Sequence, residues 1–189
     1  MRPTHSIDLQ VAPADRIRMA ALAVLRDGGP AALTTRAVCE RAGVTAPTLY
    51  HHYGDKEGLL RAVAESELQA FFGRKQRMKP SDDPLRDVKR GWDDWIAFAI
   101  EQPDLVRAVR TGGGSAASMR EAAEAIVRVR LSRLATEVPL TVDIATGARM
   151  LVVTANAVVQ VLLDGVSAPE VRRLGVLVRD GILRSIIAA

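Results

Sequence analysis

The sequence predicts an all-α protein, and three observations carry that prediction. Of the 189 residues, 48% are hydrophobic but only 4% are aromatic, which favours helices over a sandwich or barrel of aromatic and β-branched strands. Apolar residues recur at helical spacing along most of the chain, and prolines, glycines and capping residues separate these runs. With this length and 25% charged residues, the chain can bury a core and is not wholly disordered.

The first helix is expected over residues 13–27. Counted from Ile17, its apolar residues fall at i, i+3, i+4, i+7 and i+8, which describes one buried face. Pro13 suits a first helical position, where an amide hydrogen would have no intrahelical partner. The run Gly28-Gly29-Pro30 ends this helix, because glycine accepts a left-handed cap and proline cannot continue a helix.

Two short helices follow, each with a threonine that can act as its N-cap. Thr34 precedes a helix expected over 35–42, and Gly43 breaks it. Thr45 precedes the next helix, which is expected to end near His52. Two caps so close together, with a glycine between the helices, predict a helix-turn-helix.

The rest of the chain is also expected to be helical. Asp55 caps a helix that starts at Lys56 and fades in the basic stretch 74–79. The later helices are expected from 84 to the residue before Pro103, then over 103–110, 115–138, 141–166 and 169–187. Residues 127–131 alternate like a strand, but their Ala- and Glu-rich flanks extend the helical pattern. Gly112–Ser115 is expected to be a flexible loop. We expect two domains, 1–58 and 59–189.

Charge and cysteine usage bear on partners and compartment. The net charge is +4, and all of the excess lies in the first 79 residues together with the three histidines. A basic end on a neutral body is compatible with a polyanionic partner, although an excess of four is small. The lone Cys39 fits a reducing compartment and is expected to be packed rather than redox-active.

No targeting or membrane segment is expected. Residues 1–10 lack the apolar run of a signal peptide. The longest apolar stretch, 150–163, has 14 residues, whereas a membrane span needs about 20. We expect a soluble cytoplasmic protein.

The most informative segment is the helix-turn-helix over 33–56, because its polar side chains suit DNA. Such a motif must hold out its second helix rigidly so that it can enter a major groove. The amide hydrogens at helix starts suit phosphate oxygens, while base edges determine sequence preference. The alternative is a helical hairpin with a solvated polar face. The polar residues on the second helix and at the other helix starts are Thr35, Arg36, Thr45, Thr48, Tyr50, His51, His52 and Lys56.

This segment resembles the TetR family of bacterial transcriptional regulators. The resemblance covers about 14–62 and consists of the runs Leu33-Thr34-Thr35-Arg36, Ala42-Gly43-Val44 and Pro47-Thr48-Leu49-Tyr50-His51-His52-Tyr53, followed by Lys56 and Leu59-Leu60. It implies about nine helices, an N-terminal three-helix DNA-binding domain and a larger helical ligand-binding and dimerisation domain. It also implies a homodimer whose last two helices from each subunit form the interface.

By matching position, the resemblance implies roles for individual residues. Thr35 and Arg36 would contact the DNA backbone or a nearby base. Lys56 would hold a phosphate. Ala46 lacks the polar group with which some relatives read bases, so an apolar contact with a thymine methyl group is expected there. The remaining residues expected at the groove or phosphates are Thr45, Pro47, Thr48, Tyr50, His51 and His52.

Enzyme function is not expected, and neither a cofactor nor a metal site is predicted. His51 and His52 are adjacent and point about 100° apart on a helix, whereas one metal ion favours i, i+4 spacing. The Gly112–Ser115 run lacks the following Lys-Ser/Thr of a phosphate-binding loop. No histidine follows His52 to serve as a base, so no catalytic residue is proposed.

A ligand pocket is implied by the resemblance for the C-terminal region. Trp92, Trp95 and Phe98 lie at helical spacing there and either belong to the core or line the pocket. Asn156 and Gln160 belong to a polar stripe that is solvated, crosses a dimer seam or orients a ligand. The complete set of expected ligand-binding residues is Trp92, Trp95, Ile96, Phe98, Met119, Met150, Asn156 and Gln160.

The leading hypothesis is a ligand-responsive transcriptional repressor. It would bind a palindromic double-stranded DNA operator and be released by an unidentified small-molecule effector. The strongly apolar helix over 141–166 must be covered on more than one side, so 141–166 and 169–187 are expected to form a homodimer interface. The alternatives are a helical small-molecule carrier or sensor, and a dimeric scaffold that binds another protein.

Overall fold

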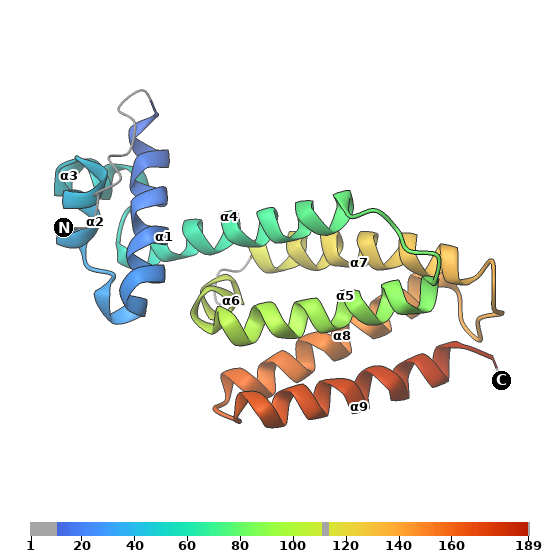
Figure 1. The fold of residues 1–189 in the computed structure, drawn as a ribbon. Coiled ribbons are helices and arrows are strands. Elements are labelled where there is room, and N and C mark those ends of the chain that lie inside the picture. Colours follow the sequence, from blue (N-terminus) through green and yellow to red (C-terminus); the bar gives the residue numbers. More distant parts are fainter. Residues whose placement is uncertain (1–10, 111–113, 189) are drawn as a thin grey trace. The chain divides into compact units, whose positions relative to one another are not determined.

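The computed structural model describes residues 11–110 and 114–188, and those residues form an all-α fold of nine helices (Figure 1). This confirms the predicted fold class. The helices are α1 (Pro13–Ala32), α2 (Thr35–Ala42), α3 (Ala46–Tyr53), α4 (Lys56–Arg77), α5 (Pro84–Glu101), α6 (Pro103–Arg110), α7 (Gly114–Leu134), α8 (Ile144–Leu163) and α9 (Ala168–Ile186).

The chain divides into two compact units, and the boundary between them along the sequence lies within α4. The N-terminal unit extends to Glu67 and the C-terminal unit begins at Leu68. One continuous helix therefore contributes to both units, and the division lies within it rather than between helices. The boundary between 58 and 59 that the sequence suggests stays a prediction.

The N-terminal unit is built around α1, which packs against α2 and α3. Ile17 and Val38 are fully buried, and Leu49 and Leu59 are almost fully buried, so each of the four helices contributes to this small core. At the expected end of α1, Gly29 adopts a left-handed conformation with φ of 68°. The helix kinks there and continues to Ala32, five residues beyond the expected end.

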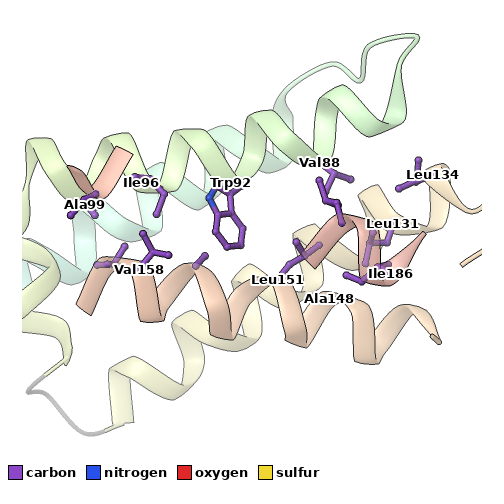
Figure 2. Close-up of a cluster of buried hydrophobic side chains, with 14 of the residues drawn as sticks. Val88, Trp92, Ile96, Ala99, Leu131, Leu134, Ala148, Leu151, Val158 and Ile186 are labelled. Carbon is purple, nitrogen blue, oxygen red and sulfur yellow. The ribbon is translucent and has the colours of Figure 1, made fainter. Parts of the chain in front are cut away.

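The C-terminal unit is organised around α5, α7, α8 and α9. Helix α8 packs against α7 and α9, and α5 contacts all three. Figure 2 shows Trp92 of α5 pointing toward α8, with Val88 and Ile96 on the same side of α5. These three side chains are each at most 5% exposed, so the apolar face that the sequence indicates for this helix is its core face.

Other helix ends also differ from the expected ones, and α8 ends at Leu163 instead of 166. Helix α7 already begins at Gly114, which was expected in a loop, one residue before the expected helix start at Ser115; Gly112 and Gly113 lie outside the described residues. Helix α7 ends at Leu134 instead of 138. Helix α8 begins at Ile144 rather than 141, because the side chain of Asp143 caps it by accepting from the amide of Thr146 at 2.9 Å.

Helix α8 is long and apolar enough, by length and composition, to cross a membrane, and it is the one such helix in the part of the chain that the structure describes. The core helix of a globular protein meets the same criterion. Ala148, Leu151, Ala155 and Val159 of α8 are buried among the other helices of the C-terminal unit. The place of α8 in the core thus accounts for part of its apolar composition.

Candidate functional site

The turn between α2 and α3 is fixed by local hydrogen bonds and by one glycine. The hydroxyl of Thr34 accepts from the amide of Ala37 at 3.1 Å and caps α2. Gly43 ends α2 in a left-handed conformation, with φ of 63° and ψ of 43°, and its amide donates to the carbonyl of Cys39. A side chain at Gly43 would disfavour this conformation, so glycine sets the angle at which α3 departs.

Helix α3 is anchored from its inner side and capped at its start. Leu49 is 1% exposed and fixes the helix to the unit's core. Thr45 is the N-cap, and its hydroxyl lies 2.9 Å from that of Thr48. At the other end, the Tyr53 hydroxyl donates to the carbonyl of Ala14 at 2.7 Å. Burial raises the pKa of Tyr53, which keeps that donor protonated.

The opposite side of α3 is open to solvent. Pro47, Tyr50, His51 and His52 are exposed, whereas Ala46 and Thr48 are half-buried at the helix start. The His51 and His52 rings lie 5.2 Å apart, edge to face. Thus Tyr50, His51 and His52 form an exposed polar surface on this helix, while Leu49 points inward.

The predicted residues on α2 and α4 border this helix differently. The Thr35 hydroxyl lies 3.2 Å from that of Tyr50, which joins the start of α2 to α3. Arg36 is exposed and donates to Glu40 at 2.8 Å, and this hydrogen bond raises the pKa of Arg36. Lys56 is exposed at the first position of α4. The arrangement thus places hydroxyls, imidazoles and cations at or beside one exposed surface.

Cys39 shows no sign of activation as a nucleophile. It is half-buried in α2, and burial raises the pKa of its thiol. A raised pKa lowers the thiolate fraction at neutral pH. The packed role expected from the sequence agrees with this environment.

A second candidate site lies entirely within the C-terminal unit. A cavity of about 270 Å³ is lined by side chains from α4, α5, α6, α7 and α8. Four of the predicted ligand-binding residues line it, namely Trp92, Trp95, Met119 and Asn156. The cavity is thus mostly apolar with a few polar groups, which is the usual character of small-molecule sites.

The other four predicted ligand-binding residues lie outside this lining. Ile96 is buried in the core, and Phe98 packs against Trp95 with ring centroids 5.9 Å apart. The carbonyl of Met150 accepts from Thr154 at 2.6 Å, within α8. The side chain of Gln160 accepts from Arg110 at 2.7 Å and donates to Asp164.

The cavity also includes residues that the sequence analysis did not single out for binding. Phe71 and Phe72 bring aromatic rings from α4, and Arg130 brings a cation from α7. Two adjacent phenylalanines in a helix that otherwise mixes polar and apolar residues are a sequence pattern that could have indicated a contribution to the cavity. No local pattern indicates Arg130, because it reaches the cavity only through the packing of α7 beside α5.

These features define an all-α protein with an N-terminal helix-turn-helix. Residues 17–63 match the family model of "Bacterial regulatory proteins, tetR family". The chain is 38% identical over 81 residues to the tetracycline repressor protein class A from transposon 1721 of Escherichia coli; the matched segment is 43% of this chain and 32% of that protein. The chain thus spans about a third of the length of the curated relatives that it matches.

Two solved structures share the fold over nearly the whole chain. A TetR-family transcriptional regulator from Pectobacterium atrosepticum is similar with a TM-score of 0.75 and 20% identity, over 93% of this chain and 94% of that one. SmeT of Stenotrophomonas maltophilia is similar with a TM-score of 0.68 and 22% identity, over 94% and 91%. The match of residues 17–63 to the tetR family model, together with the relatives, confirms the resemblance seen in the sequence of this segment.

Proposed function

We propose that this protein is a transcriptional repressor that binds DNA through α3 and releases it when a small molecule occupies the cavity. The observation that carries the proposal is the construction of α3. Its inner side is fixed by Leu49, its start is capped by Thr45, and its outer side presents polar groups to solvent. A rigid helix with a polar outer face is what major-groove recognition requires.

The predicted DNA contacts fall into two kinds. Lys56, Arg36 and Tyr50 would position the protein on phosphates, together with Thr35 and the amides at the start of α2. Thr48 and His51 would read base edges, and Ala46 and Pro47 would make apolar contacts in the groove. Thr45 and His52 complete the proposed surface. Phosphate contacts release counterions, so affinity should fall as salt rises.

A homodimer through 141–166 and 169–187 would give the operator its two-fold symmetry. Leu177 and Val176 of α9 and Val153 of α8 are large apolar side chains that remain exposed in the single chain, Leu177 at 65%. Covering them with a second copy would remove apolar surface from water. Two recognition helices would then enter successive major grooves roughly 34–36 Å apart. Such a protein acts in the bacterial cytoplasm, where the DNA is.

The cavity of the C-terminal unit would be the effector site. A ligand shifts the protein away from its DNA-binding conformation only by its differential affinity for the two states. The names of the relatives agree with this kind of control. The Escherichia coli protein is a tetracycline repressor, and SmeT is the repressor of a multidrug efflux pump.

Selection of bound DNA from a random pool tests the proposal. We expect an enriched site with two-fold symmetric halves, and binding that weakens with salt. The variant Thr48→Ala/Tyr50→Ala/Lys56→Ala keeps Leu49 and should fold, yet it should bind the selected site at background level. Undiminished binding by this folded variant, or no enrichment with the unaltered protein, would contradict the proposal and leave a carrier or a protein-binding scaffold as the better interpretation.

A further inference from the structure

The charged residues around the cavity of the C-terminal unit have one sign. Among the residues that the structure describes, its lining contains the cations Lys75, Arg110, Arg120 and Arg130, and no aspartate or glutamate. All other lining side chains are apolar except Asn156. A cavity that combines apolar walls with cations alone is complementary to a ligand that carries a negative charge.

Two of these cations already have partners. Lys75 forms an ion pair with Asp94 and lies over the ring of Phe71, 5.3 Å from its centroid. Arg110 donates to the side chain of Gln160 at 2.7 Å. These interactions occupy both groups, so neither is the first choice for holding a ligand's charge.

Arg130 differs from both, because it is half-buried and has no hydrogen bond or ion pair with any residue that the structure describes. Burial lowers the pKa of Arg130, while the charges of Asp87 and Asp94 act against this. An arginine remains charged in such a setting, so its donors are partly shielded from water and have no protein partner among the described residues. A ligand that supplies two acceptor oxygens would satisfy them.

The carboxylates of Asp87 and Asp94 have partners other than Arg130. Asp94 is paired with Lys75. Asp87 accepts from Ser81 twice, from Arg90 and from Arg133. A role for Arg130 as their counter-charge is therefore weaker than a role toward the cavity.

A glycine keeps space for the guanidinium. A Cβ atom built on Gly91 of α5 would overlap the Nη1 atom of Arg130, which comes from α7. Any other residue at this position would displace the end of the Arg130 side chain, although the backbone could stay in place. Glycine thus permits the guanidinium to lie against α5 at the edge of the cavity.

We infer that the cavity binds an amphiphilic carboxylate: a small molecule with one apolar or aromatic body, placed among Phe71, Phe72 and Trp95, and one carboxylate held by Arg130. The volume of about 270 Å³ lies just below the range of about 300–1,000 Å³ for small-molecule sites, which favours a single ring or a short chain. The inference rests on the proposed function, because it names the ligand class of the same effector site.

Direct binding with a matched series of probes tests it. The probes are 4-phenylbutanoate, its amide and 4-phenylbutylamine, which share one body and differ in charge. The two tryptophans of the chain, Trp92 and Trp95, both line the cavity, so their fluorescence reports occupancy, and calorimetry gives the affinity. We expect the carboxylate to bind about tenfold to a hundredfold more tightly than the amide, as for a hydrogen-bonded charge pair, and the amine to bind least.

Variants assign this preference to Arg130. Arg130→Met should remove the preference for the carboxylate and leave amide binding unchanged. Gly91→Ala should weaken carboxylate binding by displacing the guanidinium while its charge is kept. Arg120→Met, at an exposed cation of the same lining, is the matched control and should keep the preference. Circular dichroism establishes that each variant is folded.

The outcomes separate this inference from the proposed function. Equal binding of carboxylate and amide, tighter binding of the amine, no binding of any probe, or a preference that survives in folded Arg130→Met would overturn the inference. None of these results depends on DNA. A carboxylate preference in a protein that selects no DNA would uphold the inference about the cavity and contradict the repressor.

Discussion

The carboxylate of Asp87 in α5 accepts a hydrogen bond of 2.7 Å from the guanidinium of Arg133 in α7. Asp87 is only 3% exposed, and it also accepts from the amide and hydroxyl of Ser81 at 2.9 and 2.8 Å. Arg133 in turn donates to the carbonyl of Ser81 at 2.7 Å. One buried carboxylate thus joins the start of α5, the segment before it and the end of α7.

This relationship predicts a specific acid sensitivity. Burial by itself would raise the pKa of Asp87, but the hydrogen bonds from Ser81 and Arg133 and the charge of Arg90 outweigh it and lower the pKa from 3.8 to about 2. Because the folded-state pKa is depressed, the stabilisation is fully present above about pH 4. It is lost as the pH falls toward about 2.

Asp87→Asn should therefore lower the free energy of unfolding at pH 7 by about 2 kcal/mol, since it leaves buried donors imperfectly paired. The difference from the unaltered protein should shrink between pH 4 and pH 2. Urea unfolding at a series of pH values, at one protein concentration, measures it. Asp82→Asn, at an exposed aspartate nearby, should have little effect. A difference that stays constant with pH would contradict the role of this carboxylate.

A second prediction concerns the turn at Gly43. Alanine at φ of 63° and ψ of 43° is strained, with an expected cost of about 1–2 kcal/mol, although a Cβ atom there meets nothing within 4 Å. Gly43→Ala should lower the stability of the N-terminal unit and weaken DNA binding, since α3 would depart at another angle. Gly73→Ala, within α4, is the control and should stabilise slightly. Thermal unfolding distinguishes the two variants.

A third prediction separates positioning on DNA from sequence preference. Lys56→Ala removes one proposed phosphate contact, so affinity should fall similarly for every DNA sequence and the salt slope should decrease by about 1. Thr48→Ala should instead change the preference at one base position, by about 1–3 kcal/mol. Titration of the selected site and its single-base variants at several salt concentrations measures both effects. A change in preference with Lys56→Ala would reverse the proposed roles.

Most helix ends could be predicted because local chemistry determines them. Asp83 caps α5 just before Pro84, and its side chain accepts from the amide of Arg86 at 2.8 Å. Likewise, Thr34, Thr45 and Gly43 begin and end the short helices where the sequence indicates. Each of these residues acts within four positions along the chain, so one sequence suffices to read it.

The start of α8 shows where this kind of reading fails. Thr141 was expected to begin the helix, but its hydroxyl donates to the carbonyls of Ser185 and Ile186, at the end of α9. The amide of Thr141 also donates to Ile186. This pairing involves residues 45 positions apart, and no local pattern shows it. Asp143 instead forms the N-cap of α8.

The residues of the two candidate sites could be predicted to different extents for the same reason. The helix-turn-helix is one continuous segment, so its exposed residues could be named from spacing and from the family resemblance. The cavity is assembled from five helices, and only packing determines which faces meet. Gln160 has the right polarity, but Arg110 and Asp164 bind its side chain.

The last prediction tests whether α8 and α9 form the dimer interface. Leu177→Glu places a charge on α9 where a side chain is 65% exposed in the single chain. If that surface is covered by a second copy, the buried charge has no partner and the dimer should dissociate. DNA affinity should then fall sharply, because one half-site alone holds the protein.

Val129→Glu is the matched control, since Val129 of α7 is 66% exposed and lies outside 141–187. Sedimentation equilibrium at micromolar concentration should show a monomer for Leu177→Glu and a dimer for Val129→Glu. The opposite pattern would move the interface to α7, and a monomer for the unaltered protein would contradict the dimer altogether.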